Sequence, residues 1–72
     1  MQKDKFTLRD NEAFIELIKL LKIKQFAQTG GHAKMIIEDG LVRVNGEVEF
    51  RKRNKLKKGD LIVIDDVEIE IV

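Results

Sequence analysis

Few side chains in this 72-residue chain could carry out chemistry. His32 is the one histidine, and Thr7 and Thr29 carry the only side-chain hydroxyl groups. Thr29 and His32 have a spacing that a nucleophile and its base could use, but a threonine just before a predicted helix is more typical of an N-cap. The chain has no phosphate-binding loop, no dinucleotide fingerprint and no calcium-loop pattern around Asp65-Asp66. We therefore expect no catalysis, no cofactor, no bound metal and no small-molecule substrate.

The most informative segment for binding is the basic run RKRNKLKK, residues 51–58, which holds six cations and no acid. Runs of like charge are most often solvated loops. Here the run follows a predicted hairpin, and other candidate anion-binding groups precede it: Lys34, Arg43 and the small-residue helix start at 29–31. Free N–H groups at a helix N-terminus attract phosphate, and Lys and Arg that contact phosphates give salt-dependent binding. The pattern favours nucleic acid as the partner.

The aromatic content limits how such a partner could be recognised. The chain has no Trp or Tyr, and its four Phe residues mostly fit the predicted core pattern. Platforms that stack the bases of single-stranded RNA need exposed rings. We therefore expect contacts with the backbone and the shape of a folded RNA.

A protein-interaction module is the alternative hypothesis. Residues 59–72 carry five acids and no cation, so the formal net charge of +1 conceals a strongly dipolar distribution. In this alternative the basic run contacts an acidic partner, and the acidic last strand contacts a basic one.

Two short helices are expected before the basic run. Apolar residues recur at helical spacing between 12 and 21, with Phe14 among them, which predicts a first helix over 12–21. A second helix is predicted over 31–38. Thr29 is its expected N-cap, and Gly40 stands where a left-handed C-cap is expected.

From residue 41 onward, apolar and polar residues alternate as they do in strands. The dipeptide Asn45-Gly46 predicts a hairpin turn. A two-residue loop would place the apolar residues of the two strands on opposite faces. We therefore expect an odd-length loop with Gly46 at positive φ, which puts Val42 and Val48 on one face.

Other strands are expected at both ends of the chain. Residues 5–8 are predicted to form an edge strand, and the apolar run 61–64 a strand buried on both faces. Residues 67–71 alternate Val and Ile with Glu, which predicts a last strand with one buried and one acidic face. If the basic run is extended, alternation projects four cations to one side: Arg51, Arg53, Lys55 and Lys57.

Bulk properties limit the organisation of the chain. Its length allows one domain over 1–72, with residues 1–4 loose. The absence of cysteine fits a reducing cytoplasm, and the start MQKDKF lacks the apolar region of a signal peptide. The longest aliphatic run, 61–64, is too short to span a bilayer. We expect a cytoplasmic monomer without membrane contact.

Several short motifs occur in an order that resembles a known family. They are Thr-Gly-Gly-x-Ala-Lys from Thr29 to Lys34, Gly-x-Val-x-Val-Asn-Gly from Gly40 to Gly46, Arg-x-Arg at Arg51 and Arg53, and Lys-x-Gly-Asp from Lys57 to Asp60. Over about residues 5–72 they resemble the RNA-binding domain named after small-subunit ribosomal protein S-four, or alpha-L motif, and within it the short stand-alone bacterial YbcJ/YaaA-like proteins. The resemblance implies an α+β fold, with a two-helix alpha-L motif on a small, bent, mainly antiparallel sheet of four or five strands.

The resemblance also implies a function and a site. It implies a non-catalytic protein that binds structured RNA, such as ribosomal RNA. The residues carried over as RNA-facing are Lys34, Arg43, Asn45, Arg51 and Arg53, and charge alone adds Lys52 and Lys55. Many family members have a basic residue just after the position of Thr29, where this chain has Gly30 and Gly31. A phosphate there would have to be held by backbone N–H groups and His32.

Overall fold

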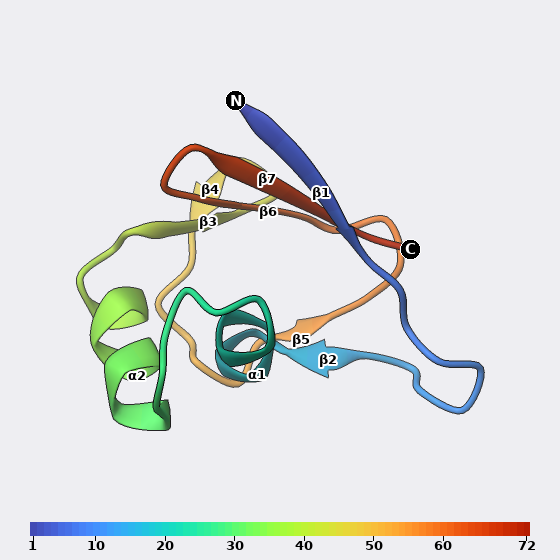
Figure 1. The fold of residues 1–72 in the computed structure, drawn as a ribbon, viewed down its shortest axis with the longest axis horizontal. Helices are drawn as coiled ribbons and strands as arrows, with labels where there is room; N and C mark the ends of the chain where they lie inside the picture. The colour runs from blue at the N-terminus through green and yellow to red at the C-terminus, as the bar shows by residue number, and fades with distance from the viewer.

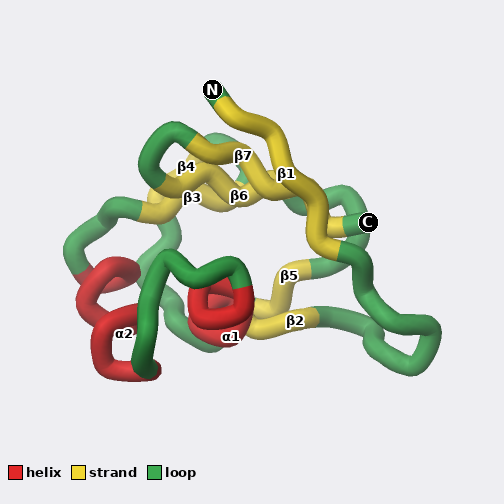
Figure 2. The backbone as a smooth tube through the Cα atoms, in the orientation of Figure 1, coloured by secondary structure: helices red, strands yellow, loops and turns green.

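A five-stranded sheet forms one layer of the molecule, and both helices lie in a second layer beneath it (Figures 1 and 2). The computed structural model describes residues 1–72. Its elements in chain order are β1 (Gln2–Phe6), β2 (Ile15–Glu16), α1 (Leu17–Ile23), α2 (Gly30–Glu38), β3 (Val42–Val44), β4 (Glu47–Val48), β5 (Lys55–Leu56), β6 (Leu61–Ile64) and β7 (Val67–Ile71).

The sheet has the strand order β1-β7-β6-β3-β4. Only the β1–β7 pair is parallel, and the other three pairs are antiparallel. A separate antiparallel ribbon joins β2 to β5 beside α1 (Figure 1). The predicted α+β architecture with a mainly antiparallel sheet is confirmed.

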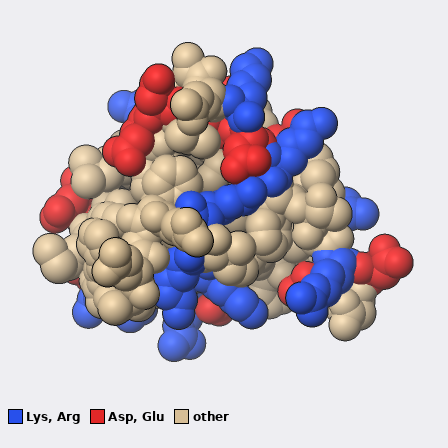
Figure 3. All heavy atoms as spheres, in the orientation of Figure 1, with Lys and Arg blue, Asp and Glu red and all other residues tan.

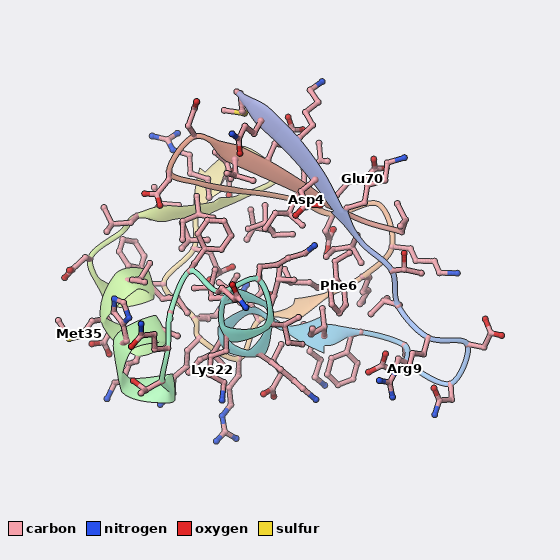
Figure 4. All side chains as sticks on the ribbon, viewed as in Figure 1. Asp4, Phe6, Arg9, Lys22, Met35 and Glu70 are labelled. Carbon is pink, nitrogen blue, oxygen red and sulfur yellow. The ribbon has the colours of Figure 1, made fainter.

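The first residues of the chain are part of the sheet. The expectation that residues 1–4 would be loose is wrong, because β1 runs in register along β7 from Gln2 onward. The edge strand predicted at 5–8 therefore lies a few residues earlier. The carboxylate of Asp4, which is labelled in Figure 4, forms an ion pair of 2.9 Å with Nζ of Lys24 and so connects β1 to the segment after α1. Periodicity missed this strand because its exposed residues have no apolar alternation.

The core between the layers is wholly apolar. Its buried members are Leu8, Ile15, Leu17, Leu20, Leu21, Ala27, Ala33, Ile37, Val42, Leu56, Ile62, Ile64, Ile69 and Ile71. The prediction that β6 would be buried on both faces is wrong, because Leu61 is 37% exposed and Val63 is only half-buried. In β7, Ile69 and Ile71 are buried as predicted.

Helix α1 begins later than the apolar spacing predicts. Residues 12–14 are not helical, and Ile15 and Glu16 pair with β5 instead. The first N–H groups of α1 are bonded from outside the helix: Leu17 N–H donates to the carbonyl of Asn54 at 3.0 Å, and Ile18 N–H to that of Lys52 at 2.9 Å. These carbonyls satisfy N–H groups that a helix start leaves unpaired. A segment distant in sequence therefore fixes where α1 starts.

The hairpin between β3 and β4 has a two-residue turn. Val44 pairs directly with Glu47, and Asn45 and Gly46 have φ values of 52° and 88°. Two left-handed residues are what the tight turn of this hairpin class requires. The positive φ of Gly46 is confirmed, but the predicted odd-length loop is wrong.

The two-residue turn reverses which side chains of the returning strand face outward. Val48 and Phe50 are 38% and 61% exposed, whereas the side chain of Glu49 is only 13% exposed. The prediction that Val42 and Val48 share a buried face is therefore wrong. The fold tolerates the reversal because β4 has two residues and lies at the edge of the sheet, where no core needs its apolar side chains.

Gly40 is a position where a side chain should be costly. Its φ is +75°, and an added Cβ would lie 3.4 Å from Cε1 of Phe50. We expect Gly40→Ala to lower the free energy of unfolding by about 1–2 kcal/mol, because a left-handed conformation strains non-glycine residues. Urea denaturation followed by circular dichroism measures this loss. Gly30→Ala is the matched control, because a Cβ at Gly30 meets nothing within 4 Å; equal losses in both variants would contradict the prediction.

Candidate nucleic-acid interface

The basic run does not form the extended segment that alternation predicts. Residues 51–54 form a turn, closed by a hydrogen bond of 3.1 Å from the N–H of Asn54 to the carbonyl of Arg51. Only Lys55 and Leu56 are extended, as β5. The turn arises because the carbonyls of Lys52 and Asn54 face the start of α1.

The turn nevertheless gathers cations around one hollow of about 420 Å³, named here the basic hollow. Its lining residues are Arg51, Arg53, Asn54, Lys55 and Lys57. No acid lines it, so the positive charges reinforce one another there. The four cations predicted to project together do so, although the backbone that carries them differs from the prediction. Lys52, which charge alone had added, lies outside this lining.

Most of the charge of the basic hollow is unpaired. Arg51 is the only one of its four cations in an ion pair, with Glu49. The ammonium of Lys55 lies 5.0 Å from the ring centroid of Phe14, and Arg53 and Lys57 have no anionic partner. These groups remain available to an anionic ligand.

Glu49 organises the turn from its partly buried position. Its Oε2 accepts hydrogen bonds from N and Nε of Arg51 at 2.9 and 3.0 Å. Its Oε1 accepts from Nη2 of Arg51 at 3.1 Å and from Nδ2 of Asn54 at 2.8 Å. The bond from Arg51 lowers the pKa of Glu49 against the opposing effect of burial, and the same pair raises the pKa of Arg51. Glu49 thereby fixes the orientation of two residues that line the basic hollow.

A second hollow of about 440 Å³ adjoins the first. Its lining residues are Val44, Asn45, Glu47, Val48, Glu49, Arg51, Asn54 and Asp60. Arg51 and Asn54 line both hollows. The second hollow mixes acids with one arginine, so it lacks the single sign of charge of the basic hollow.

Asn45, predicted to face RNA, has a side chain engaged within the protein. Its Nδ2 donates to Oδ1 of Asp60 at 3.1 Å, and its Oδ1 accepts from the N–H of Leu61 at 3.0 Å. These bonds fasten the hairpin turn to the start of β6. Contact of Asn45 with RNA stays a prediction.

The start of α2 keeps the geometry that the sequence predicts. Oγ1 of Thr29 accepts a hydrogen bond from the backbone N–H of His32 at 3.0 Å, so Thr29 is the N-cap of α2. The N–H groups of Gly30 and Gly31 have no partner in the protein, and a Cβ added at Gly30 would meet nothing within 4 Å. Free N–H groups at such a helix start can donate hydrogen bonds to a phosphate oxygen.

The remaining predicted residues lie outside the basic hollow. Lys34 forms an exposed ion pair of 4.0 Å with Glu38, one turn further along α2. Arg43 is exposed in β3, between Val48 and Val63 of the neighbouring strands. Whether RNA contacts them stays a prediction.

Further cations extend the basic surface beyond the predicted set. In Figure 3, Lys and Arg side chains gather along the lower edge, over the helices and the connection from β4 to β5. Figure 4 places Lys22 of α1 at this edge. Sequence reasoning missed Lys22 because a lysine on an amphipathic helix is ordinarily a solvated residue.

The phenylalanines do not all belong to the core. Phe6 and Phe26 pack against it, but Phe14 and Phe50 are 37% and 61% exposed. The expectation that the rings are mostly buried is therefore wrong for two of them. Phe14 is exposed because it precedes α1 instead of lying within it, and Phe50 because of the hairpin register.

Two other observations limit the site. No group of three or more His, Cys, Asp or Glu side chains could hold a metal ion. Neither helix has the length and apolar character that crossing a bilayer would require.

Known proteins are similar to this chain in sequence and in fold. The family model for the S4 domain matches residues 6–72. "Putative RNA-binding protein YbcJ" of Escherichia coli (strain K12) is 36% identical over 58 residues, which are 81% of this chain and 83% of that protein. YbcJ of Shigella flexneri matches with the same identity and coverage. The solution structure of E. coli YbcJ, described as having an alpha-L motif involved in RNA binding, has a TM-score of 0.69 and 34% identity over 94% of this chain and 85% of that chain. This chain belongs to the S4 domain family and has the alpha-L fold.

Proposed function

We propose that this protein binds structured RNA through phosphate contacts and catalyses no reaction. The observation that carries the proposal is the basic hollow, in which four cations meet without an acid and three lack an anionic partner. Membership of the S4 domain family and the RNA-binding motif described for YbcJ support it. Ribosomal RNA is the proposed target class, because the family is named after a ribosomal protein.

The basic hollow supplies the affinity in this proposal. Each Lys or Arg that neutralises a phosphate releases condensed counterions, which favours binding at low salt. Arg51 is held by Glu49 through Nε and one N–H of Nη2, so its remaining N–H groups are free for a phosphate. The open N–H groups of Gly30 and Gly31 supply a second phosphate site at α2.

The protein-interaction alternative loses support from the placement of β1. Lys3 and Lys5 stand opposite Glu68 and Glu70 in the parallel β1–β7 pair. Opposite charges on neighbouring strands attract, so the acids of the last strand already have cations beside them. The acidic surface that would attract a basic protein is correspondingly weaker.

The location and the assembly of the protein are separate proposals. We propose a cytoplasmic location, because the chain has no cysteine for disulfides, and we propose that the protein is a monomer. Size-exclusion chromatography with light scattering measures the assembly directly.

Titration of a labelled RNA hairpin at several salt concentrations tests the proposed function. Four phosphate contacts predict a slope of log K against log salt of roughly −3 to −4. Fluorescence anisotropy measures both the Kd and the slope. If the hairpin fails to bind below about micromolar concentration at low salt, where non-specific basic binders usually bind, the proposal is wrong.

A further inference from the structure

Phe50 presents an aromatic ring that is both exposed and supported. The residue is 61% exposed. Atoms Cε1 and Cζ of its ring lie 3.4 and 3.7 Å from the position that a Cβ on Gly40 would occupy, and Cγ1 of Val48 lies 3.6 Å from the same position. One edge of the ring therefore rests on bare glycine backbone beside Val48. Because that support leaves much of the ring uncovered, Phe50 is a preformed apolar surface facing solvent.

Phe50 lines neither hollow, but its neighbours on both sides of it in the chain do. Phe50 immediately precedes Arg51, and consecutive Cα atoms are about 3.8 Å apart. Val48, the neighbour of the ring, lines the second hollow together with Arg51. A ligand whose phosphates contact the basic hollow thus has another of its groups within reach of Phe50.

The surroundings of the ring favour a nucleobase over a protein side chain. Leu41 and Met35 are 56% and 62% exposed and also lie in the segment around Gly40, so the region offers apolar surface to a protein as well. The buried centres of protein interfaces, however, are depleted of charged residues. Surfaces that bind unpaired nucleic acid combine a cationic groove with an aromatic ring, which is the combination formed by Phe50 and the basic hollow.

We propose that Phe50 is the stacking site for one unpaired nucleobase of the RNA whose phosphates bind the basic hollow. The inference rests on the proposed function and adds a ligand group to it. Stacking on an aromatic ring accepts any base at a bulge or loop. The RNA class that fits is a folded RNA with an extruded nucleotide.

Two RNA hairpins test this site. One carries a single bulged 2-aminopurine, and the other an abasic nucleotide at the same place. We expect the wild type to bind the first about tenfold more tightly, because stacking on an aromatic side chain is worth about that factor per base. Binding should also quench the 2-aminopurine fluorescence.

Three variants separate stacking from structural support. Phe50→Leu keeps an apolar cover over Gly40 and should lose the preference and the quenching, with unchanged affinity for the abasic hairpin. Phe50→Trp should keep the preference, and its emission, from the only tryptophan of the chain, should fall on binding the bulged hairpin. Phe14→Leu, at the other exposed phenylalanine, should keep the preference and the quenching, while loss of its contact with Lys55 changes the affinity for both hairpins alike.

The outcomes distinguish this inference from the proposed function. If the wild type binds both hairpins equally, or if Phe50→Leu keeps the preference, the stacking site is wrong while RNA binding by the basic hollow stands. The exposed ring would then be assigned to a protein partner. If the wild type binds neither hairpin, the proposed function is wrong and the stacking site falls with it.

Discussion

Replacing Arg53 and Lys57 together by glutamate is expected to weaken RNA binding about a hundredfold or more near 0.1 M salt. Both side chains line the basic hollow, and neither has an anionic partner to lose. Each lost phosphate contact removes the release of about one counterion, and each new carboxylate repels the phosphates. The slope of log K against log salt should fall in magnitude by about two units. Anisotropy titration of a labelled hairpin measures both quantities.

A second double reversal controls for net charge. Arg9→Glu with Lys19→Glu makes the same change in charge, but these residues line a different hollow, beside Glu12 and Ile15. We expect a much smaller loss of affinity in this variant. The residues replaced in both double variants are exposed, so both proteins should keep the circular dichroism spectrum of the wild type. Equal losses in the two would mean that RNA responds to total charge and not to the basic hollow.

Glu49→Gln is expected to weaken RNA binding about tenfold, although it removes an acid from a basic surface. Both oxygens of Glu49 accept from donors on Arg51, and Oε1 also accepts from Asn54. Glutamine has one oxygen, so its amide nitrogen would face donors it cannot accept from. The guanidinium of Arg51 then loses the orientation that directs it to the basic hollow.

Glu47→Gln is the matched control for this prediction. Glu47 is exposed, lies two residues earlier in β4 and forms no ion pair or side-chain hydrogen bond. Its replacement should leave the affinity unchanged or slightly higher, because only Coulomb repulsion is removed. Glu49→Gln should thus lower the RNA affinity, whereas Glu47→Gln should not. Should both raise the affinity, Glu49 would count simply as an unfavourable charge.

The same variant has a pH signature. The pKa of Glu49 is lowered on folding, mainly by its bond from Arg51, so its folded pKa lies below the ordinary value of 4.5. The stabilisation that it contributes is therefore complete above the unfolded pKa and is lost as the pH falls through the folded pKa. We expect Glu49→Gln to lose stability at neutral pH and to show a weaker further loss on acidification than the wild type. Thermal unfolding between about pH 7 and pH 2, the range in which carboxyl groups titrate, measures the difference.

Elements with local signals are predictable from this sequence. Helix α2 carries its own start at Thr29 and its own stop at Gly40, so both ends are correctly located to within one residue. The Asn45-Gly46 turn is equally local. The predicted odd-length loop is wrong because it requires both strands of the hairpin to cover core, whereas β4 is a two-residue edge strand.

Elements whose limits depend on distant residues are not predictable in this way. The start of α1 depends on carbonyls of the basic run, and no pattern within residues 12–21 records that. The strand β1 depends on its partner β7, since its own residues are polar and exposed. The local periodicity of a segment does not indicate its contacts with distant segments, such as those of α1 with the basic run and of β1 with β7.

Some residues of the candidate site are likewise predictable from local sequence, and others depend on distant contacts. The cations of the basic run are evident from the sequence. Their prediction on one side holds, although the predicted extended backbone is wrong. The roles of Glu49 and Phe50 depend on which of the two side chains faces inward. The register set by the two-residue turn determines this orientation. An acid two residues before an acid-free basic run is the signal that could have indicated Glu49.

The backbone bonds that start α1 couple the first turn of the helix to the folded basic run. Leu17 and Ile18 donate their amide protons to the carbonyls of Asn54 and Lys52, and α1 has no side-chain cap of its own. A ligand that binds only the folded basic run stabilises whatever unfolds together with it. Occupancy of the basic hollow should therefore be visible as slower hydrogen exchange at two amides that the RNA never touches.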